Sequence, residues 1–294
     1  GPGGGPGGVP LRLAYRGPFA SAELFDYLQR RAITGVEEVT GERGARLYRR
    51  TLRLPNGTGI AEVREAAGDG WLDCRLHLAE LRDLTTVTQR IRRLFDLDAD
   101  PYAVAELLGA DPRLAGAVAE RPGLRAPGTT DPHELAVRAV LGQQVSVVAG
   151  RRLGDALVAA HGERLPAPSG GLTHLFPRAE DLADAALSGI GMPESRRATL
   201  RTLCTALADG SVGLDPGAER DGAEQSLLAL RGIGPWTAGY IRMRALGDPD
   251  VLLTGDVAVR AGLRRIGGEL ADAAGWRPWR TYAMHHLWNL AARP

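Results

Sequence analysis

Residues 230–240 read "LRGIGPWTAGY", and they join two segments with the apolar spacing of helices, "AEQSLLAL" and "TAGYIRMRAL". Gly232 and Gly234 allow a short, sharp connection, and Pro235 suits the first turn of the second helix. The free N–H groups at that helix start would lie beside the glycines and form a site for an anion such as phosphate. A plain turn between two packed helices explains the same residues, so this stretch alone leaves both interpretations open.

Aromatic side chains follow the glycines at helical spacing. Trp236 and Tyr240 are four residues apart and therefore share one face of the second helix. Aromatic residues make up only 5% of the chain, yet Trp288 lies near its end with two further tryptophans close by. Such side chains either pack in a core or form an electron-rich cleft in which an extruded, electron-poor base stacks.

Asp256 stands at the start of the next helical run, in "LLTGDVAVRAGL". Aspartate is a favoured residue at the N-cap of a helix, and capping alone explains its presence. A carboxylate at the lip of a pocket could also stabilise positive charge on a sugar or activate water against it. The two interpretations are compatible, because a cap position holds an aspartate rigidly.

Composition excludes several kinds of protein. The sequence contains no lysine, so no lysine amine can form a Schiff base. Cys74 and Cys204 make no CxxC spacing, which argues against a zinc finger, an iron–sulfur cluster or a disulfide framework. The net charge of +1 gives no sign of a nucleic-acid partner. No apolar run approaches the length of a membrane span and no signal pattern opens the chain, so we expect a cytoplasmic, nucleoid-associated protein without a membrane partner.

The pattern of apolar residues changes from strand-like to helical along the chain, and it predicts an α+β fold. Residues 1–10, "GPGGGPGGVP", read as a linker. Residues 11–98 alternate like antiparallel strands with accompanying helices, and they predict a small N-terminal α/β domain. Beyond it the pattern is almost wholly helical, and the run over 131–162 reads as helix throughout.

An ordered set of motifs resembles one known family. "RPGLRAPG", "RAVLGQQVSV", "GERL", "GMPESRRA", "GIGPWTAGY", "DVLLTGD" and "WRPWRTYAMHHLW" follow one another as in the helix-hairpin-helix DNA glycosylases, in the branch of bacterial DNA-3-methyladenine glycosylase II. The resemblance runs from Leu11 to the end of the chain. It implies a two-lobed helical body, with residues 131–248 carrying the hairpin. Residues 99–130 and 249–294 would form the second lobe, which carries the catalytic aspartate.

The resemblance also assigns roles to individual residues. It implies that Asp256 is catalytic, that Gln144 is the wedge filling the gap left by a flipped base, and that no cofactor takes part in catalysis. The family's best-known form has an aliphatic wedge, so Gln144 departs from that pattern. The remaining roles are base-pocket walls (Trp236, Tyr240, Trp288), phosphate binding at the hairpin (Gly232, Gly234, Thr237), and backbone carbonyls for a Na⁺ or K⁺ ion (Leu228, Leu230, Gly232).

The implied reaction is hydrolysis of the N-glycosidic bond of alkylated bases in double-stranded DNA, such as 3-methyladenine and 7-methylpurines, leaving an abasic site for base excision repair. Strand-cleaving relatives carry a lysine where this chain has Trp236, so we expect a monofunctional enzyme without lyase activity. The missing cysteine quartet separates it from the relatives that hold an iron–sulfur cluster. We expect a monomer, fused to or cut from an alkylation-sensing domain.

Three alternatives share the same motifs. The first is a helix-hairpin-helix module that binds DNA without catalysis, which would not depend on Asp256. The second is an enzyme for oxidised guanine, against which the absence of the hairpin lysine argues. The third is a scaffold or fusion partner tethered by the glycine-rich start, which is compatible with enzymatic activity.

Overall fold

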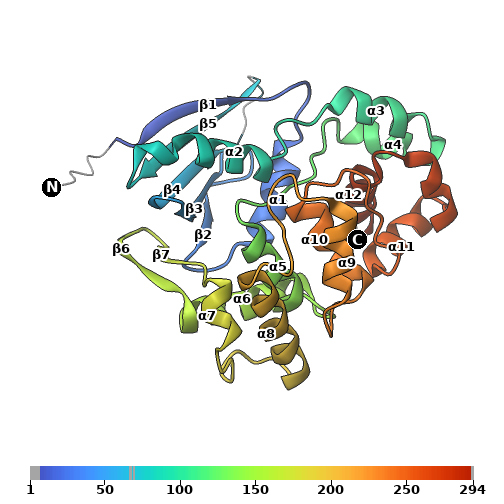
Figure 1. Ribbon diagram of the computed structural model, residues 1–294. Helices are drawn as coiled ribbons and strands as arrows, with labels where there is room; N and C mark the ends of the chain where they lie inside the picture. The colour runs from blue at the N-terminus through green and yellow to red at the C-terminus, as the bar shows by residue number, and fades with distance from the viewer. Residues whose placement is uncertain (1–6, 66–67, 69, 293–294) are drawn as a thin grey trace.

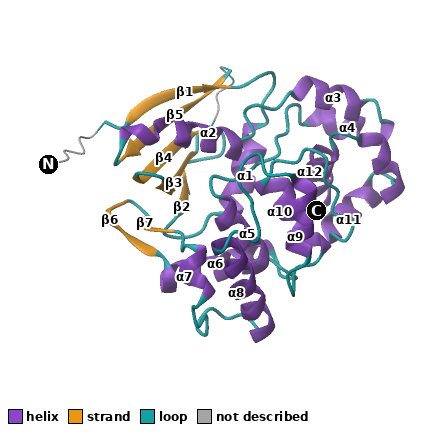
Figure 2. Ribbon diagram, in the orientation of Figure 1, coloured by secondary structure: helices purple, strands orange, loops and turns teal. Residues whose placement is uncertain are grey.

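The computed structural model describes residues 7–65, 68 and 70–292 of the chain. A five-stranded sheet lies at one end of the molecule, and helices make up most of the rest (Figure 1). Figure 2 shows the sheet and a small hairpin on one side and most of the helices on the other. The predicted α+β class, with a small sheet domain before a mostly helical body, is confirmed. None of the helices in the described part combines the length and apolar character that a membrane crossing requires.

The N-terminal sheet is antiparallel throughout, and its strands lie in the order β1-β5-β4-β3-β2. Alternating side chains explain the strands: Leu72, Cys74 and Leu76 are buried. Asp73 and Arg75 between them face solvent. The strands are β1 (Val9–Ala14), β2 (Glu37–Thr40), β3 (Leu47–Leu54), β4 (Gly57–Arg64) and β5 (Trp71–Leu78).

The predicted linker over residues 1–10 is too long at its C-terminal end. Strand β1 begins at Val9, which pairs with Leu76, and Pro10 pairs with Arg75. Proline is tolerated there because β1 lies at the edge of the sheet, where one row of backbone groups needs no partner. The first six residues of the predicted linker lie outside the described part of the chain.

Two helices pack in one hydrophobic core with the sheet. Phe25 and Leu28 of α1 (Ser21–Arg31) lie in this core together with Val87 and Ile91 of α2 (Leu84–Leu94), which follows the 3₁₀ turn η1 (Leu81–Asp83). The last turn of α1 extends beyond this core toward the helical body. The C-terminal end of α1 therefore lies between the sheet domain and the helical body (Figure 1).

The helical body is punctuated by aspartate–proline pairs. Asp100, Asp111 and Asp131 each accept a hydrogen bond from the backbone of the helix they precede, and each is followed by a proline in the first turn. The helices are α3 (Pro101–Gly109), α4 (Pro112–Glu120), α5 (Pro132–Leu141), α6 (Val147–His161), α7 (Ala179–Ala183), α8 (Glu194–Ala208), α9 (Arg220–Leu228), α10 (Pro235–Ala245), α11 (Val257–Arg265) and α12 (Arg280–Ala291), with the 3₁₀ segment η2 (Leu270–Trp276).

The helix expected over 131–162 is interrupted, contrary to the prediction. Helix α5 ends before Gly142, and α6 begins after Ser146, whose hydroxyl caps it by accepting a hydrogen bond from the N–H of Ala149 at 3.2 Å. Between them Gln144 adopts a left-handed backbone conformation with φ of 54°. The apolar spacing continues across the gap, which is why the sequence pattern did not show the break.

A short hairpin in the helical half was also not predicted. Strand β6 (Glu163–Ser169) pairs with β7 (Leu172–Leu175). The first strand contains two prolines and reads as a loop, so local propensity does not favour it. Tertiary contacts stabilise it, since Thr51 in β3 donates to the carbonyl of His174 at 2.8 Å.

Two further cores divide the helical body, and α10 lies between them. Ala238 and Ile241 of α10 pack with α5, α8 and α9 in one core. Met243 of the same helix packs with α3, α4, α11 and α12 in the other core. Tyr240 on this helix packs against both cores, and Trp236 packs against the second of them.

Buried ion pairs tie the sheet to α5. Arg50 in β3 donates to Glu134 at 2.7 Å, and Arg138 donates to Glu37 at 2.8 Å. Burial disfavours the charged guanidinium of Arg50, but Glu134, Tyr48 and Glu37 outweigh it and raise the pKa of Arg50. Removing one partner would leave an uncompensated buried charge.

We therefore expect Arg50→Met to lower the free energy of unfolding by about 3–5 kcal/mol, because the two buried carboxylates of Glu134 and Glu37 would be left with the single guanidinium of Arg138. Urea unfolding followed by circular dichroism measures the change. Arg53→Met is the matched control: Arg53 pairs with the exposed Glu163 at 2.7 Å, and its loss should cost less than about 1 kcal/mol. Equal losses in the two variants would contradict this account.

Candidate functional site

A cleft of about 1360 Å³ opens at the junction of the sheet domain and the helical body. Helix α1, the α5–α6 break, the hairpin before α10, the start of α11 and helix α12 all contribute to its lining. Arginines outnumber carboxylates along it, so the cleft is positive although the chain is nearly neutral, and a cleft of this charge suits a polyanion such as nucleic acid. The charged lining residues are Arg30, Arg31, Arg125, Arg138, Arg151, Arg196, Arg244, Glu23 and Asp256.

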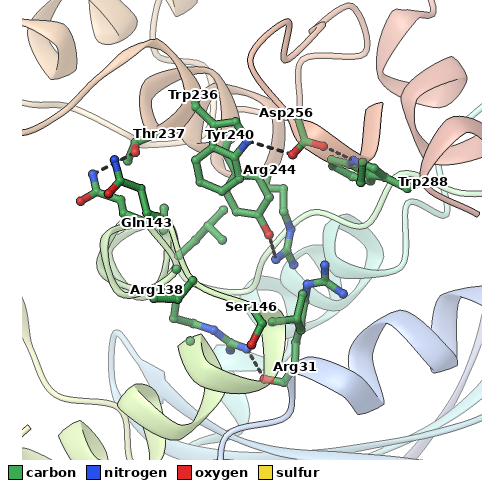
Figure 3. A pocket seen from close by; sticks show the side chains of 18 of the residues that line it. Arg31, Arg138, Gln143, Ser146, Trp236, Thr237, Tyr240, Arg244, Asp256 and Trp288 are labelled. Carbon is green, nitrogen blue, oxygen red and sulfur yellow. Dashed lines mark hydrogen bonds between the residues drawn. The ribbon is translucent and has the colours of Figure 1, made fainter. Parts of the chain in front are cut away.

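Six side chains in this cleft form a closed ring of contacts, which we call the pocket ring (Figure 3 labels four of them). The predicted site residues Asp256, Trp236, Tyr240 and Trp288 belong to it. In order around the ring, the contacts are Asp256–Trp236, Trp236–Tyr240, Tyr240–Tyr27, Tyr27–His285, His285–Trp288 and Trp288–Asp256.

Asp256 accepts three N–H groups. Trp236 donates its indole N–H to Oδ2 at 2.9 Å, and Trp288 donates its indole N–H to Oδ1 at 3.1 Å (Figure 3). The backbone N–H of Val259 donates to Oδ1 at 2.9 Å, so Asp256 also caps α11. Both interpretations of this residue from the sequence are therefore compatible with its geometry. Among the described residues no arginine or histidine forms an ion pair with Asp256, which leaves its charge available to a ligand.

Trp236 and Tyr240 form one aromatic wall and not two. Their rings stack on each other with centroids 5.1 Å apart and an angle of 10° between planes. A flat ligand can lie against this wall but cannot insert between the two rings. Trp288 approaches from α12 on the other side of Asp256 and provides the second aromatic surface (Figure 3).

Tyr27 and His285 complete the ring, and the sequence did not single out either of them. The hydroxyl of Tyr27, on α1, lies 3.0 Å from that of Tyr240. His285 makes edge-to-face contacts with Tyr27 at 5.7 Å and with Trp288 at 5.0 Å. His285 stands one helical turn before Trp288, and that spacing was the available signal. Nothing in the sequence around Tyr27 indicates its long-range contact.

Two guanidinium groups lie against the tyrosine pair. Arg31 stacks over the ring of Tyr27 at 3.6 Å, and Arg244 donates to the hydroxyl of Tyr240 at 3.1 Å. Burial alone would raise the pKa of Tyr240, but Arg244, Arg31 and the hydrogen bonds to its hydroxyl outweigh it and lower that pKa. The Tyr240 hydroxyl therefore loses its proton more readily than an ordinary tyrosine, whereas burial raises the pKa of Tyr27.

The two hairpin glycines differ in what requires them. Gly232 has a φ of 90°, and a Cβ there would lie 2.0 Å from Oγ1 of Thr199. Gly234 has an ordinary φ of −99°, and a Cβ there would meet open space. The fold therefore requires glycine at 232 but not at 234. No hydrogen bond among the described residues engages the backbone N–H of Gly234 or of Thr237, so these donors are free at the start of α10.

Gln143, which the sequence did not single out, contacts the hairpin. Its amide nitrogen donates to the carbonyl of Gly232 at 3.1 Å and to the hydroxyl of Thr237 at 3.0 Å (Figure 3). Gln144 follows it at the tip of the α5–α6 break, where it is exposed and lines the cleft.

Two of the three backbone carbonyls predicted to bind an alkali ion already accept a hydrogen bond. The Leu230 carbonyl accepts from the N–H of Ile233 at 3.1 Å, and that of Gly232 accepts from Gln143. Each oxygen keeps a second lone pair, and the Leu228 carbonyl accepts no backbone bond from beyond α9 in the described chain. Within the same residues, no group of three or more His, Cys, Asp or Glu side chains is arranged to hold a metal.

Comparison with known proteins gives a consistent picture. Residues 10–131 match the family model described as the AlkA N-terminal domain. The chain is 46% identical to the probable bifunctional transcriptional activator/DNA repair enzyme AlkA of Mycobacterium tuberculosis, aligning over 98% of its own length and 58% of that protein. It therefore spans little more than half the length of this relative. It is 31% identical to DNA-3-methyladenine glycosylase 2 of Escherichia coli strain K12, over 94% of this chain and 95% of that protein.

A solved structure has the same fold. The 3-methyladenine DNA-glycosylase from Archaeoglobus fulgidus superposes with a TM-score of 0.76. The match covers 96% of this chain and 98% of that one at 18% identity. The similarity therefore extends across the sheet domain and the helical body together.

The two glycines should respond differently to the same substitution. Gly232→Ala should lower the free energy of unfolding by about 1–3 kcal/mol, because its Cβ would overlap Thr199 and its φ is unfavourable for alanine. Gly234→Ala should change stability by less than about 0.5 kcal/mol. Thermal unfolding of the two variants side by side tests this, and a loss of stability at Gly234 would show that the fold itself requires that glycine.

Proposed function

The chain belongs to the DNA-3-methyladenine glycosylase 2 family, as its motifs predicted, and we propose that it releases alkylated bases from double-stranded DNA and leaves an abasic site. The observation that carries this proposal is the Asp256 carboxylate, oriented by two indole N–H groups inside an arginine-lined cleft. Substrates of the 3-methyladenine and 7-methylpurine type fit such a site, because their rings carry positive charge and stack well on aromatic faces.

In this reaction the protein has two main tasks, to position the damaged base and to stabilise the positive charge on the sugar. The damaged nucleotide turns out of the duplex, and its base lies against the wall of Trp236 and Tyr240. As the glycosidic bond breaks, its electron pair stays on the base and neutralises the base's positive charge. The Asp256 carboxylate stabilises the positive charge that develops on the sugar. Water adds to C1′ of the sugar, and its proton leaves through the carboxylate to solvent.

The hairpin and the α5–α6 break would hold the DNA. The free N–H groups of Gly234 and Thr237 suit a backbone phosphate, and the open space at Gly234 lets the phosphate approach closely. Gln144, exposed at the tip of the break, would enter the gap left by the flipped base, where its amide can hydrogen-bond the orphan partner base. Gln143 would then fix the hairpin relative to that wedge.

Two further features belong to the proposal. The carbonyls of Leu228, Leu230 and Gly232 would hold a Na⁺ or K⁺ ion, since oxygen ligands with free lone pairs suit hard cations. The ion would add positive charge beside the bound phosphate. No cofactor is required for base release.

The proposed chemistry ends at base release. Trp236 occupies the position of the lysine nucleophile of strand-cleaving relatives, and its indole N–H is engaged by Asp256. With no lysine in the sequence, no side-chain amine can attack the sugar. We propose a monofunctional enzyme that acts as a monomer at the nucleoid. We propose that it cooperates with an alkylation-sensing domain; the name of the Mycobacterium tuberculosis relative, a probable bifunctional transcriptional activator and DNA repair enzyme, supports the presence of an activator domain beside it.

Asp256→Asn should lower the rate of base release by about 10²–10³-fold, because the carboxylate charge is lost while the cap of α11 can be kept. The assay incubates dimethyl-sulfate-treated duplex DNA with the protein and measures released methylpurines; the strand should stay intact until hot alkali is added. Asp131→Asn, a cap in α5 away from the cleft, is the matched control and should retain wild-type activity. A fully active Asp256→Asn protein would refute the assignment and favour a non-catalytic DNA-binding module.

Trp236→Phe should lower kcat for base release by about tenfold, because Oδ2 of Asp256 loses its donor while the stack on Tyr240 is kept. The affinity for undamaged duplex DNA should not change, since the contacts with the DNA backbone come from the backbone N–H groups of Gly234 and Thr237 and not from the indole. Trp279→Phe, outside the cleft, is the control. An unchanged kcat in Trp236→Phe would show that the indole N–H does not orient the carboxylate for the reaction.

A further inference from the structure

His285 is the member of the pocket ring with unused polar atoms. The indoles of Trp236 and Trp288 both donate to Asp256, and the hydroxyls of Tyr27 and Tyr240 bond each other. Neither ring nitrogen of His285 has a hydrogen-bond partner in the described part of the chain, although the residue is only 4% exposed and lines the cleft. These nitrogens are not among the fully enclosed unpartnered atoms of the described residues, so they are accessible from the cleft. A base that covers them must supply a hydrogen-bond partner, because a polar group that loses its solvent without one is costly.

The surroundings fix the orientation of the imidazole. Its ring stands at 86° to that of Trp288 and at 63° to that of Tyr27, so aromatic neighbours hold it on two sides. Trp288 separates His285 from Asp256 in the pocket ring. A base with its glycosidic nitrogen at Asp256 would therefore extend its opposite edge past the indole toward His285.

The imidazole is neutral. Burial, followed by the charges of Arg31 and Arg244 and by His286, lowers the pKa of His285 to about 3. A neutral imidazole has one donor nitrogen and one acceptor nitrogen, and exchange of the tautomer reverses which is which. It therefore adds no positive charge next to a cationic base, and it can pair with either an amino or a carbonyl group.

We propose that His285 is a base-reading residue, whose ring nitrogen hydrogen-bonds the group at position 6 of the flipped purine, opposite the glycosidic bond. The proposal rests on the proposed function and adds a specificity determinant to it. Because the tautomer can change, the same residue accepts 6-amino and 6-oxo purines. A purine with neither group leaves the buried imidazole unpaired and is rejected.

Binding of two free bases tests this without catalysis. 3-Methyladenine and 3-methylpurine differ only in the 6-amino group, and their binding can be followed by quenching of tryptophan fluorescence, since Trp236 and Trp288 line the cleft. The wild-type protein should bind 3-methyladenine about tenfold more tightly. His285→Leu should bind the two bases equally, and His285→Asn, which keeps a donor and an acceptor, should restore most of the preference. His133→Leu, a histidine outside the cleft, should behave as wild type.

The possible outcomes separate this inference from the proposed function. A preference that survives in His285→Leu, or no binding of either base, would overturn the base-reading role. Equal loss of preference in the Leu and Asn variants would show that His285 acts by packing alone, which also overturns it. Failure of the wild-type protein to release methylpurines from DNA would instead refute the proposed function, and the binding ratios would still decide the role of His285.

Discussion

The hydrogen bonds from two indoles to one carboxylate organise the whole site. Asp256 joins three separate helices, since Trp236 lies in the first turn of α10, Trp288 lies in α12 and the aspartate itself caps α11. The same bonds that orient the carboxylate also orient the two aromatic surfaces beside it. A single set of contacts therefore positions both the carboxylate charge of Asp256 and the aromatic surfaces of Trp236 and Trp288, and neither can shift without the other.

The sheet domain takes part in the site and does more than support the helices. Its helix α1 supplies Tyr27, which closes the pocket ring through Tyr240. The C-terminal end of α1 is held in turn by α5, since Arg138 donates to the carbonyl of Arg31 at 2.6 Å. Residues of both parts therefore line the cleft, and the structural similarity to the solved protein also extends over both parts.

Local signals in the sequence were sufficient for the fold class, and they drew attention to Trp236 and Asp256, whose roles stay predictions. Alternation in β5 and the capping pairs before α3, α4 and α5 are short-range features, and Trp236 and Asp256 follow from the hairpin and a cap. The β6–β7 hairpin, the break after α5 and the contacts of Tyr27 and Gln143 depend on residues more than fifty positions away. Spacing along one chain segment does not encode such contacts. Motif resemblance supplied the aromatic walls but not the fact that Trp236 and Tyr240 form a single wall.

The cleft is lined with arginine and contains no lysine. A guanidinium stays protonated at any pH a cell reaches, so the positive potential of the cleft does not vary with pH. Acetylation, which silences charge on lysine amines, has no lysine to act on in this sequence. The positive potential of the cleft is therefore set by the arginines of the sequence, and lysine modification cannot change it.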